Sequence, residues 1–428
     1  MKEKVLRNIL PWVLSLGLIL SLPQESYGYS VLTHEAIIDM AWNDSITPLL
    51  IKRFPDLTAD QLLEAHAYAY GGAIIQDMGY FPFGSKLFTD LAHYVRSGDF
   101  VESLIAESQD INEYAFALGA LAHYAADNEG HSRAVNPSVP ILYPKMQAKY
   151  GNEVTYDEDP AKHLKTEFGF DVVQMARGRY APGDYRNFIG FKVSKPVLER
   201  SFKKTYGIEM KDIFTDLDLA IGTYRRTASV IIPKMTKVAW ETKKDEIEKL
   251  TPGTTDQKFI YNLSVASYET EWGTQYKRPG VVTKILAFCF RIIPKVGPLK
   301  ALAFRPATPE TERMFITSID AALDQYRLML SRVGAGHLDL PNRNFDTGQP
   351  THAGDYRLAD RTYATLLNKL ADHNFNNVSS DLRQDLLAFY SNLSAPIATK
   401  KDRSDWRKTV RAIDQLKAAR AEIKQAAR

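Results

Sequence analysis

The residues best suited to chemistry are His123, Asp127 and His131, which follow one another at intervals of four. On a helix, side chains at this spacing share one face and lie about one turn apart. The positions before them are largely apolar, so the helix is expected to be buried. Buried imidazoles and a buried carboxylate need polar partners, and a metal ion supplies them. The alternative is a set of ordinary polar helix residues, but three in register favour a metal site.

Two further pairs carry the same donor types. His163 and Glu167 are again four residues apart, at the start of an expected helix. Asp77 and His93 flank a loop rich in glycine and proline, residues 78–84, which allows the chain to bend. We expect this bend to bring Asp77 near His93.

The start of the chain resembles a secretory signal. Three basic residues precede a largely apolar run, residues 9–22, and the small residues Ser26 and Gly28 precede the expected cut. Cleavage there would make Tyr29 the first mature residue, and the protein would be exported to the periplasm or the medium. The alternative is an uncleaved anchor. After cleavage, the free amine and carbonyl of Tyr29 can chelate a metal ion, with His34 close behind.

These residues together offer one amino terminus, five imidazoles and three carboxylates: Tyr29, His34, Asp77, His93, His123, Asp127, His131, His163 and Glu167. The single cysteine, Cys289, excludes a thiolate cluster and an internal disulfide. Nine donors without a thiolate, with an aspartate bridging, suit two or three zinc ions in a hydrolytic site.

Positioning these donors requires helices, and helical periodicity is what the chain shows. Apolar residues recur three and four apart in the ranges 36–41, 59–69, 111–126, 161–177, 212–250, 311–332 and 356–370. Thr58 and Thr308 are expected helix caps. We predict an all-α fold, with loops at 137–160 and 334–354. The net charge of +3 over 428 residues gives no reason to expect specific nucleic-acid binding.

The ordered donor set resembles the zinc-dependent phospholipase C superfamily, which includes bacterial phospholipases C, single-strand-specific nucleases and the N-terminal domain of glycosylphosphatidylinositol phospholipase D. The resemblance covers about residues 29–180. The short spacing from Asp127 to His131 is similar to the glycosylphosphatidylinositol phospholipase D branch. Fungal nucleases have Asp where Glu167 stands, and this difference favours a lipid phosphodiester as substrate.

The resemblance implies how the donors are shared. His93, His123 and Asp127 would hold one zinc, with Asp77 beside it as a ligand or base. The second zinc would take three other residues: His131, His163 and Glu167. Tyr29, His34 and the bridging Asp127 would hold a third. Asp77 is the best candidate to orient or deprotonate the attacking water.

We therefore predict an exported zinc-dependent phosphodiesterase, phospholipase C-like, that hydrolyses phospholipid headgroup esters through metal-activated water. The alternatives are a single-strand nuclease or nucleotidase of the same superfamily, and a non-catalytic membrane-binding protein that zinc stabilises. The expected organisation is a signal peptide at 1–28, a phospholipase C-like helical domain at 29–250, and a helical C-terminal region at 251–428 of unknown role.

Other segments have two interpretations each. Val281–Arg305 is apolar with five basic residues and no acidic one, which suits either a membrane contact or a buried helical hairpin. Residues 400–428 suggest a docked amphipathic helix rather than a tail. Arg96 either clamps a phosphate or pairs with Asp99. His66 is more simply a structural histidine than a ligand.

Overall fold

The computed structural model describes residues 31–176, 191–228, 304–395 and 403–426, together with positions 245, 246, 249, 397 and 400. Within these residues nearly all the regular secondary structure is helical, and the prediction of an all-α fold is confirmed. The expected signal peptide, Tyr29 and most of Val281–Arg305 lie outside the described residues.

The helices of the first half, in chain order, are α2 (Val31–Ala41), η1 (Trp42–Ile46), α3 (Thr47–Arg53), α4 (Ala59–Gly72), η2 (Ile75–Tyr80), α5 (Lys86–Tyr94), α6 (Ser97–Glu107), α7 (Ile111–Gly130), η3 (His131–Val135), α8 (Asn136–Leu142), α9 (Pro144–Tyr150) and α10 (Pro160–Ala176). The second half contributes α11 (Lys195–Tyr206), η5 (Met210–Asp212), α12 (Leu217–Arg226), α16 (Pro309–Ala335), the strands β1 (Arg343–Asn344) and β2 (Gln349–Pro350), α17 (Arg357–Asp372), α18 (Ser380–Phe389) and α19 (Arg403–Ala426).

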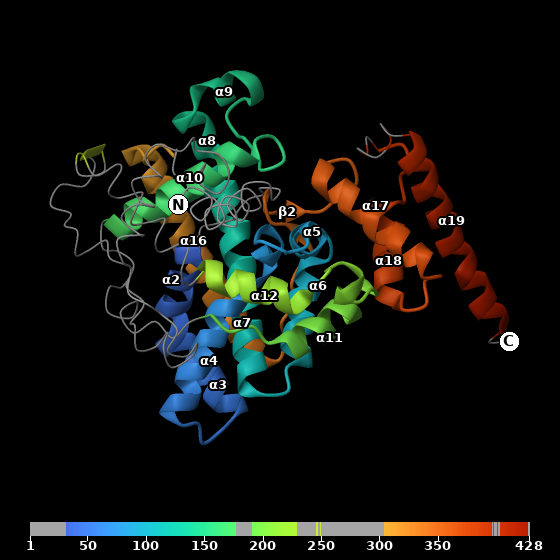
Figure 1. Ribbon diagram of the computed structural model, residues 1–428, viewed down its shortest axis with the longest axis horizontal. Coiled ribbons are helices and arrows are strands. Elements are labelled where there is room, and N and C mark those ends of the chain that lie inside the picture. The colour runs from blue at the N-terminus through green and yellow to red at the C-terminus, as the bar shows by residue number, and fades with distance from the viewer. Residues whose placement is uncertain are drawn as a thin grey trace, which may run out of the picture.

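Helix α7 forms the centre of the fold, with α2, α4, α6 and α16 packed around it (Figure 1). Its N-terminus is capped by Asp110, whose carboxylate accepts the backbone N–H groups of Asn112 and Glu113. Almost every side chain of α7 is buried, including His123 and Asp127. Many of its residues are alanine or glycine, and their small size lets neighbouring helices approach on all sides.

Two glycines set the distance between α4 and α7. A Cβ added to Gly72 would lie 1.9 Å from the carbonyl oxygen of Phe116, and one added to Gly119 would lie 2.1 Å from that of Ala69. Each glycine thus faces the backbone of the opposite helix. This close crossing brings the loop after α4 against α7.

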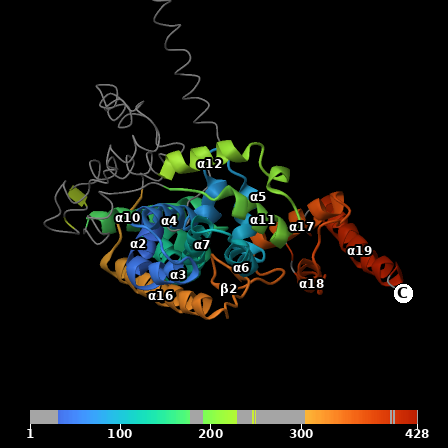
Figure 2. The same ribbon diagram turned by 90° about the horizontal axis from the view of Figure 1, so that it is seen from below.

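Helix α16 lies along the opposite edge of the molecule from α11 and α12 (Figure 2). Its N-cap Thr308 accepts the N–H of Thr311, as Thr58 accepts that of Gln61 at the start of α4, so both expected caps are confirmed. Within α16, Tyr326 is fully buried and donates its hydroxyl to the carbonyl of Leu118 on α7 at 2.9 Å. A helix from the C-terminal half therefore completes the core around α7.

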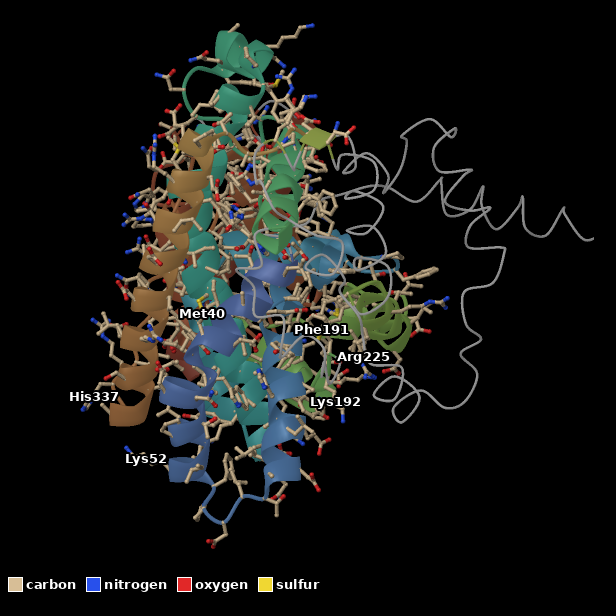
Figure 3. All side chains as sticks on the ribbon, turned by 90° about the vertical axis from the view of Figure 1, so that its left-hand side faces the viewer. Met40, Lys52, Phe191, Lys192, Arg225 and His337 are labelled. Carbon is tan, nitrogen blue, oxygen red and sulfur yellow. The ribbon has the colours of Figure 1, made fainter. Side chains whose placement is uncertain are left out.

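Met40, Lys52 and Lys192, which are labelled in Figure 3, each take part in a hydrogen bond that joins neighbouring segments. Lys52 donates to the carbonyl oxygen of Gly334 at 2.7 Å, and Arg327 to that of Met40 at 3.1 Å, joining α16 to α3 and α2. On another face, the backbone N–H of Lys192 donates to Ala67 O at 3.0 Å.

The last three helices, α17 to α19, extend to one side of the bundle (Figure 1). Helix α17 packs against α5 and α19, and α19 buries Ile413 and Leu416. The prediction of a docked amphipathic helix near the C-terminus is confirmed. Among the described residues, every helix is too short or too polar to cross a lipid bilayer.

Of the two predicted loops, the first is partly helical and the second contains a short hairpin. The predicted loop at 137–160 is wrong in its first half, because α8 and α9 occupy residues 136–142 and 144–150. Proline begins α9, where its missing N–H costs nothing. In α8, which directly follows the π-helical turn η3, the chain accommodates Pro137 at the second position and Pro140 inside the helix. The loop at 334–354 holds the short β1–β2 hairpin, with Arg343 opposite Pro350.

We expect Gly119→Ala to lower the free energy of unfolding by about 1–3 kcal/mol, because the added methyl group meets the α4 backbone and neither helix can yield without repacking. The control is Gly222→Ala on α12, where an added Cβ meets nothing within 4 Å among the described residues. That control should stabilise the protein by about 0.4–1 kcal/mol. Urea unfolding of the two variants and the wild type checks both. Equal stabilities would contradict the close crossing.

We expect Asp385→Asn to stabilise the protein above pH 6 and to have little effect at pH 4. Burial raises the pKa of Asp385 to about 6, although Arg96 opposes this increase. The folded state then binds more protons than the unfolded state between about pH 4 and 6, so wild-type stability falls as pH rises through this window. The asparagine variant should escape a loss of up to about 3 kcal/mol. Unfolding curves at pH 4, 6 and 8 measure this; parallel pH profiles would contradict it.

Candidate metal centre

The carboxylate of Asp127 lies at the middle of the site, fully buried on α7. Its Oδ2 atom is 3.0 Å from His123 Nε2 and 3.4 Å from His93 Nε2. Its Oδ1 atom is 3.5 Å from His34 Nε2 and 3.8 Å from His131 Nε2. One carboxylate thus faces a different pair of imidazoles with each oxygen, which is the arrangement a bridging ligand needs.

Asp77, His93 and His123 form the first donor group, with their ligand atoms within 4.8 Å of one another. They come from η2, α5 and α7. His93 Nε2 lies 3.3 Å from Asp77 Oδ1 and 3.4 Å from His123 Nε2. A tetrahedral zinc with bonds of about 2.0–2.1 Å holds neighbouring ligand atoms about 3.3 Å apart. These separations therefore match the edges of a zinc coordination sphere.

The backbone fixes which nitrogen of these two imidazoles faces the group. His93 Nδ1 is 2.8 Å from the carbonyl oxygen of Thr89, and His123 Nδ1 is 2.9 Å from that of Ala73. A carbonyl only accepts hydrogen bonds, so both Nδ1 atoms carry the proton. In the neutral rings, both Nε2 lone pairs then point into the same space, where they require a shared cation.

Electrostatics agree with a cation at this place. Burial lowers the pKa of His93, but Asp127 and Asp77 outweigh it and raise that pKa to about 10. A proton on His93 thus compensates the two carboxylates when no metal does. Metal ions and protons therefore compete for this imidazole.

His34, His123 and Asp127 form the second donor group. The ring of His34 stacks on that of His123, with centroids 4.4 Å apart and planes at 16°. Burial and the neighbouring His123 lower the pKa of His34 to about 3, so this imidazole is neutral at neutral pH. Helix α2 is held in place by Asp171 of α10, which accepts the N–H of Leu32 at 3.2 Å. Tyr29 lies outside the described residues, so chelation by the amino terminus stays a prediction.

His131, His163 and Glu167 form the third donor group. His163 Nε2 lies 2.8 Å, and His131 Nε2 3.6 Å, from Glu167 Oε1. His131 begins η3, a π-helical turn that continues α7, and such turns are frequent at functional sites. Burial raises the pKa of Glu167 well above its usual value, and His131 opposes this rise. A bound cation would remove that penalty.

The three groups pass a chemical test for zinc. Within the described part of the chain, both carboxylate oxygens of Asp127 and of Glu167 and both ring nitrogens of His163 are buried and make no hydrogen bond of normal geometry. Burying such atoms without partners is costly. The carboxylate oxygens lie at the separations expected of two atoms bound to one metal ion, for example 2.8 Å between Glu167 Oε1 and His163 Nε2, but without the angles of a hydrogen bond. Imidazole and carboxylate donors without thiolate are typical of hydrolytic zinc sites.

One residue of the site was not anticipated from the sequence. Asp346, in the β1–β2 hairpin, is 1% exposed and its Oδ1 atom lies 3.3 Å from His131 Nδ1. The resemblance ends near residue 180 and gave the residues beyond it no role, so it did not point to Asp346. The signal available in the sequence was only an Asn-Phe-Asp-Thr-Gly turn, and nothing local connects a turn to a helix more than 200 residues earlier.

Two other polar candidates have structural partners. Arg96 donates to Asp99 at 2.6 Å and to the carbonyl of Thr205 at 2.9 Å, which favours pairing over phosphate binding. His66 lies 3.0 Å from Asp39 and stacks on Trp42 at 3.8 Å, so it is a structural histidine.

Comparisons with known proteins agree with this geometry. The family model described as zinc dependent phospholipase C matches residues 33–216. The matched range contains every predicted ligand except Tyr29, and it excludes Asp346. Searches of curated proteins and of solved structures found no significant match to the chain.

We expect His163→Ala to lower the zinc content by one equivalent, because the third donor group then retains only two of its three residues. The matched control is His66→Ala, which removes a histidine outside the three groups and should leave the zinc content at the wild-type value. Elemental analysis after gel filtration in metal-free buffer measures both. Equal zinc in the His163 variant and the wild type would contradict the third group.

Proposed function

Because residues 33–216 belong to the zinc-dependent phospholipase C superfamily, we propose that the protein is a zinc-dependent phosphodiesterase that hydrolyses phospholipid headgroup esters. The observation that carries the proposal is the position of Asp127, which joins three donor groups into one buried cluster. Structural zinc sites are typically single and closed, with four ligands. Adjoining sites of imidazole and carboxylate are typical of phosphoester hydrolysis.

Each donor group would hold one zinc ion. The first zinc would be held by Asp77, His93 and His123, and the second by His131, His163 and Glu167. His34 and Asp127 would hold the third, with Tyr29 if the signal peptide is removed. When bound, zinc supplies a Lewis acid for the phosphate and lowers the pKa of a water molecule near neutrality.

The protein's own residues orient the reaction. Asp127 keeps the donor groups in contact, so that positive charge concentrates where negative charge grows on the phosphate. His93 and His131 are 3% and 4% exposed, while His34 and His123 are fully buried. Among the described residues, the phosphate would therefore reach the cluster from the side of His93 and His131.

Asp77 is the proposed base. It lies at the cluster with its Oδ1 atom beside His93, and this oxygen makes no other hydrogen bond of normal geometry within the described ranges. A carboxylate in this position can orient an attacking water and hold its proton. Tyr80, which is partly exposed and follows Asp77 in the same short helix, stands between His93 and Tyr156. It would border the path of the substrate.

We also propose that the protein acts after export, as the basic and apolar N-terminal residues suggest. Contact with a membrane through Val281–Arg305 is a further proposal. At its end, Phe304 is 1% exposed and packs against Phe168, with ring centroids 5.5 Å apart. Phe304 itself would therefore take no part in a lipid contact.

The test is hydrolysis by the zinc-loaded protein of three substrates: phosphatidylcholine vesicles, phosphatidylinositol vesicles and single-stranded DNA. We expect cleavage of lipid, loss of activity with a chelator and recovery with zinc. Chromatography of the products identifies which side of the phosphate is cut. Faster cleavage of DNA would support the nuclease alternative. Zinc binding without hydrolysis of any of the three substrates would contradict the proposed phosphodiesterase activity and support a zinc-stabilised binding protein.

We expect Asp77→Asn to lower kcat by about 10²–10⁴-fold while most zinc is retained, because the amide keeps an oxygen but cannot take a proton. The control is Asp90→Asn on α5, a largely buried carboxylate that pairs with Lys86 at 2.7 Å outside the donor groups. The control should keep wild-type kcat. A variant at Asp77 with full activity would exclude it as the base.

A further inference from the structure

The β1–β2 hairpin, residues 343–350, is built into the metal centre although it lies far outside the range that matches the family. The backbone N–H of Phe345 donates to the carbonyl of His93 at 3.1 Å. Asn136 donates to the carbonyl of Asp346 at 2.8 Å, and Ser97 to that of Arg343 at 2.6 Å. The backbone of one predicted ligand, His93, and side chains from two segments between the predicted ligands thus hold the hairpin in place.

The hairpin brings two adjacent side chains to the site. Phe345 is fully buried, with its ring centroid 5.1 Å from that of His93 and 6.0 Å from that of His123. It packs against the imidazoles of the first donor group. Asp346 faces the imidazoles of the third group, His131 and His163.

The carboxylate of Asp346 is held in a defined orientation. Its Oδ2 atom accepts the backbone N–H of Tyr156 at 2.9 Å and the hydroxyl of Tyr356 at 2.7 Å. Its Oδ1 atom lies 3.3 Å from His131 Nδ1 and 3.8 Å from His163 Nε2, and makes no hydrogen bond of normal geometry to the described residues. Two donors on one oxygen therefore leave the other oxygen directed at the imidazoles.

The side of His131 that Asp346 contacts determines its role. His131 presents Nε2 to Glu167 and Asp127, at 3.6 and 3.8 Å, and presents Nδ1 to Asp346. On the His131 ring, the carboxylate thus contacts the nitrogen that does not face Glu167 and Asp127, while the same oxygen lies 3.8 Å from His163 Nε2. Metal-binding histidines commonly donate their second N–H to a carboxylate, which fixes the tautomer and strengthens the ligand.

We propose that Asp346 is a positioning residue for the metal centre, accepting the Nδ1 proton of His131 and holding Nε2 toward Glu167 and Asp127. This inference rests on the zinc site of the proposed function. It assigns the C-terminal half a direct role in that site. The fold and the metal would then be coupled, since zinc binding at the third donor group requires the hairpin to be in place.

The test is chelator competition on the purified full-length protein carrying Asp346→Asn. We expect the affinity for one zinc to fall about 10–100-fold while the other zinc ions are held as in the wild type and the full count is restored at saturating zinc. The matched control is Asp44→Asn, a carboxylate on η1 that pairs with Arg327 of α16 at 2.8 Å, outside the three donor groups and the hairpin. This control should leave every zinc affinity unchanged.

A second measurement separates positioning from simple packing. Thermal unfolding with and without zinc should show a smaller zinc-induced rise of Tm for Asp346→Asn than for the wild type. Relative to the wild type, the variant should lose more stability with zinc than without it, because the loss of a fixed His131 orientation also weakens the bound metal. Equal losses of stability in both states, or unchanged zinc affinities, would overturn the proposal.

Tyr356→Phe decides the matter if the asparagine variant fails to fold. It keeps the charge of Asp346 and removes one hydrogen bond that orients it, so the same zinc should bind several-fold more weakly; unchanged affinity would count against the proposal. The outcome is separable from the proposed function. If the wild-type protein binds zinc but cleaves no substrate, the proposed phosphodiesterase activity is wrong, and the role of Asp346 can still be tested. If the wild-type protein binds no zinc, both the proposed activity and the role of Asp346 are wrong.

Discussion

The structure depends on a buried carboxylate, Asp127, placed among four imidazoles near the C-terminal end of the central helix α7. A lone buried charge of this kind is costly, and the neighbouring histidines offset this cost. The pKa of Asp127 is held well below its usual value by His123 and His131 despite its burial. Zinc at the adjoining donor groups would compensate the charge in full. The metal is then part of the folding free energy as well as of the chemistry.

This constraint explains the construction of the helical core. A central helix that carries buried ligands must be covered on all sides, and small residues along α7 permit this. Gly119 and Gly72 allow α4 to cross α7 at backbone contact, which brings the carbonyl of Ala73 to His123. Helix α16 covers another face, with Tyr326 bound to the α7 backbone. The contact between α4 and α7 therefore both packs the core and orients the His123 ring.

The C-terminal half is continuous with this arrangement. A boundary near residue 250 remains a prediction, but α16 and the β1–β2 hairpin follow that position and contact the central helix or the metal-site histidines. Buried apolar residues from α4, α7, α16 and α17 belong to one continuous core. The range that matches the family, residues 33–216, thus contains the donors, and later residues enclose them.

The helical class, the two threonine caps and the spacing of donors along each helix could be predicted from the sequence, because helical periodicity and i,i+4 pairs are local properties. The bend between Asp77 and His93 also predicted that these two residues lie close together. The loop prediction was wrong for residues 137–150, because the helices there accommodate proline at positions 137, 140 and 144 instead of ending at it. Only the tertiary structure decided how α2, α5, α7 and α10 bring their donors together, and which nitrogen of each imidazole faces the cluster. It alone placed Asp346 beside His131, because contacts between distant segments depend on packing that no local pattern encodes.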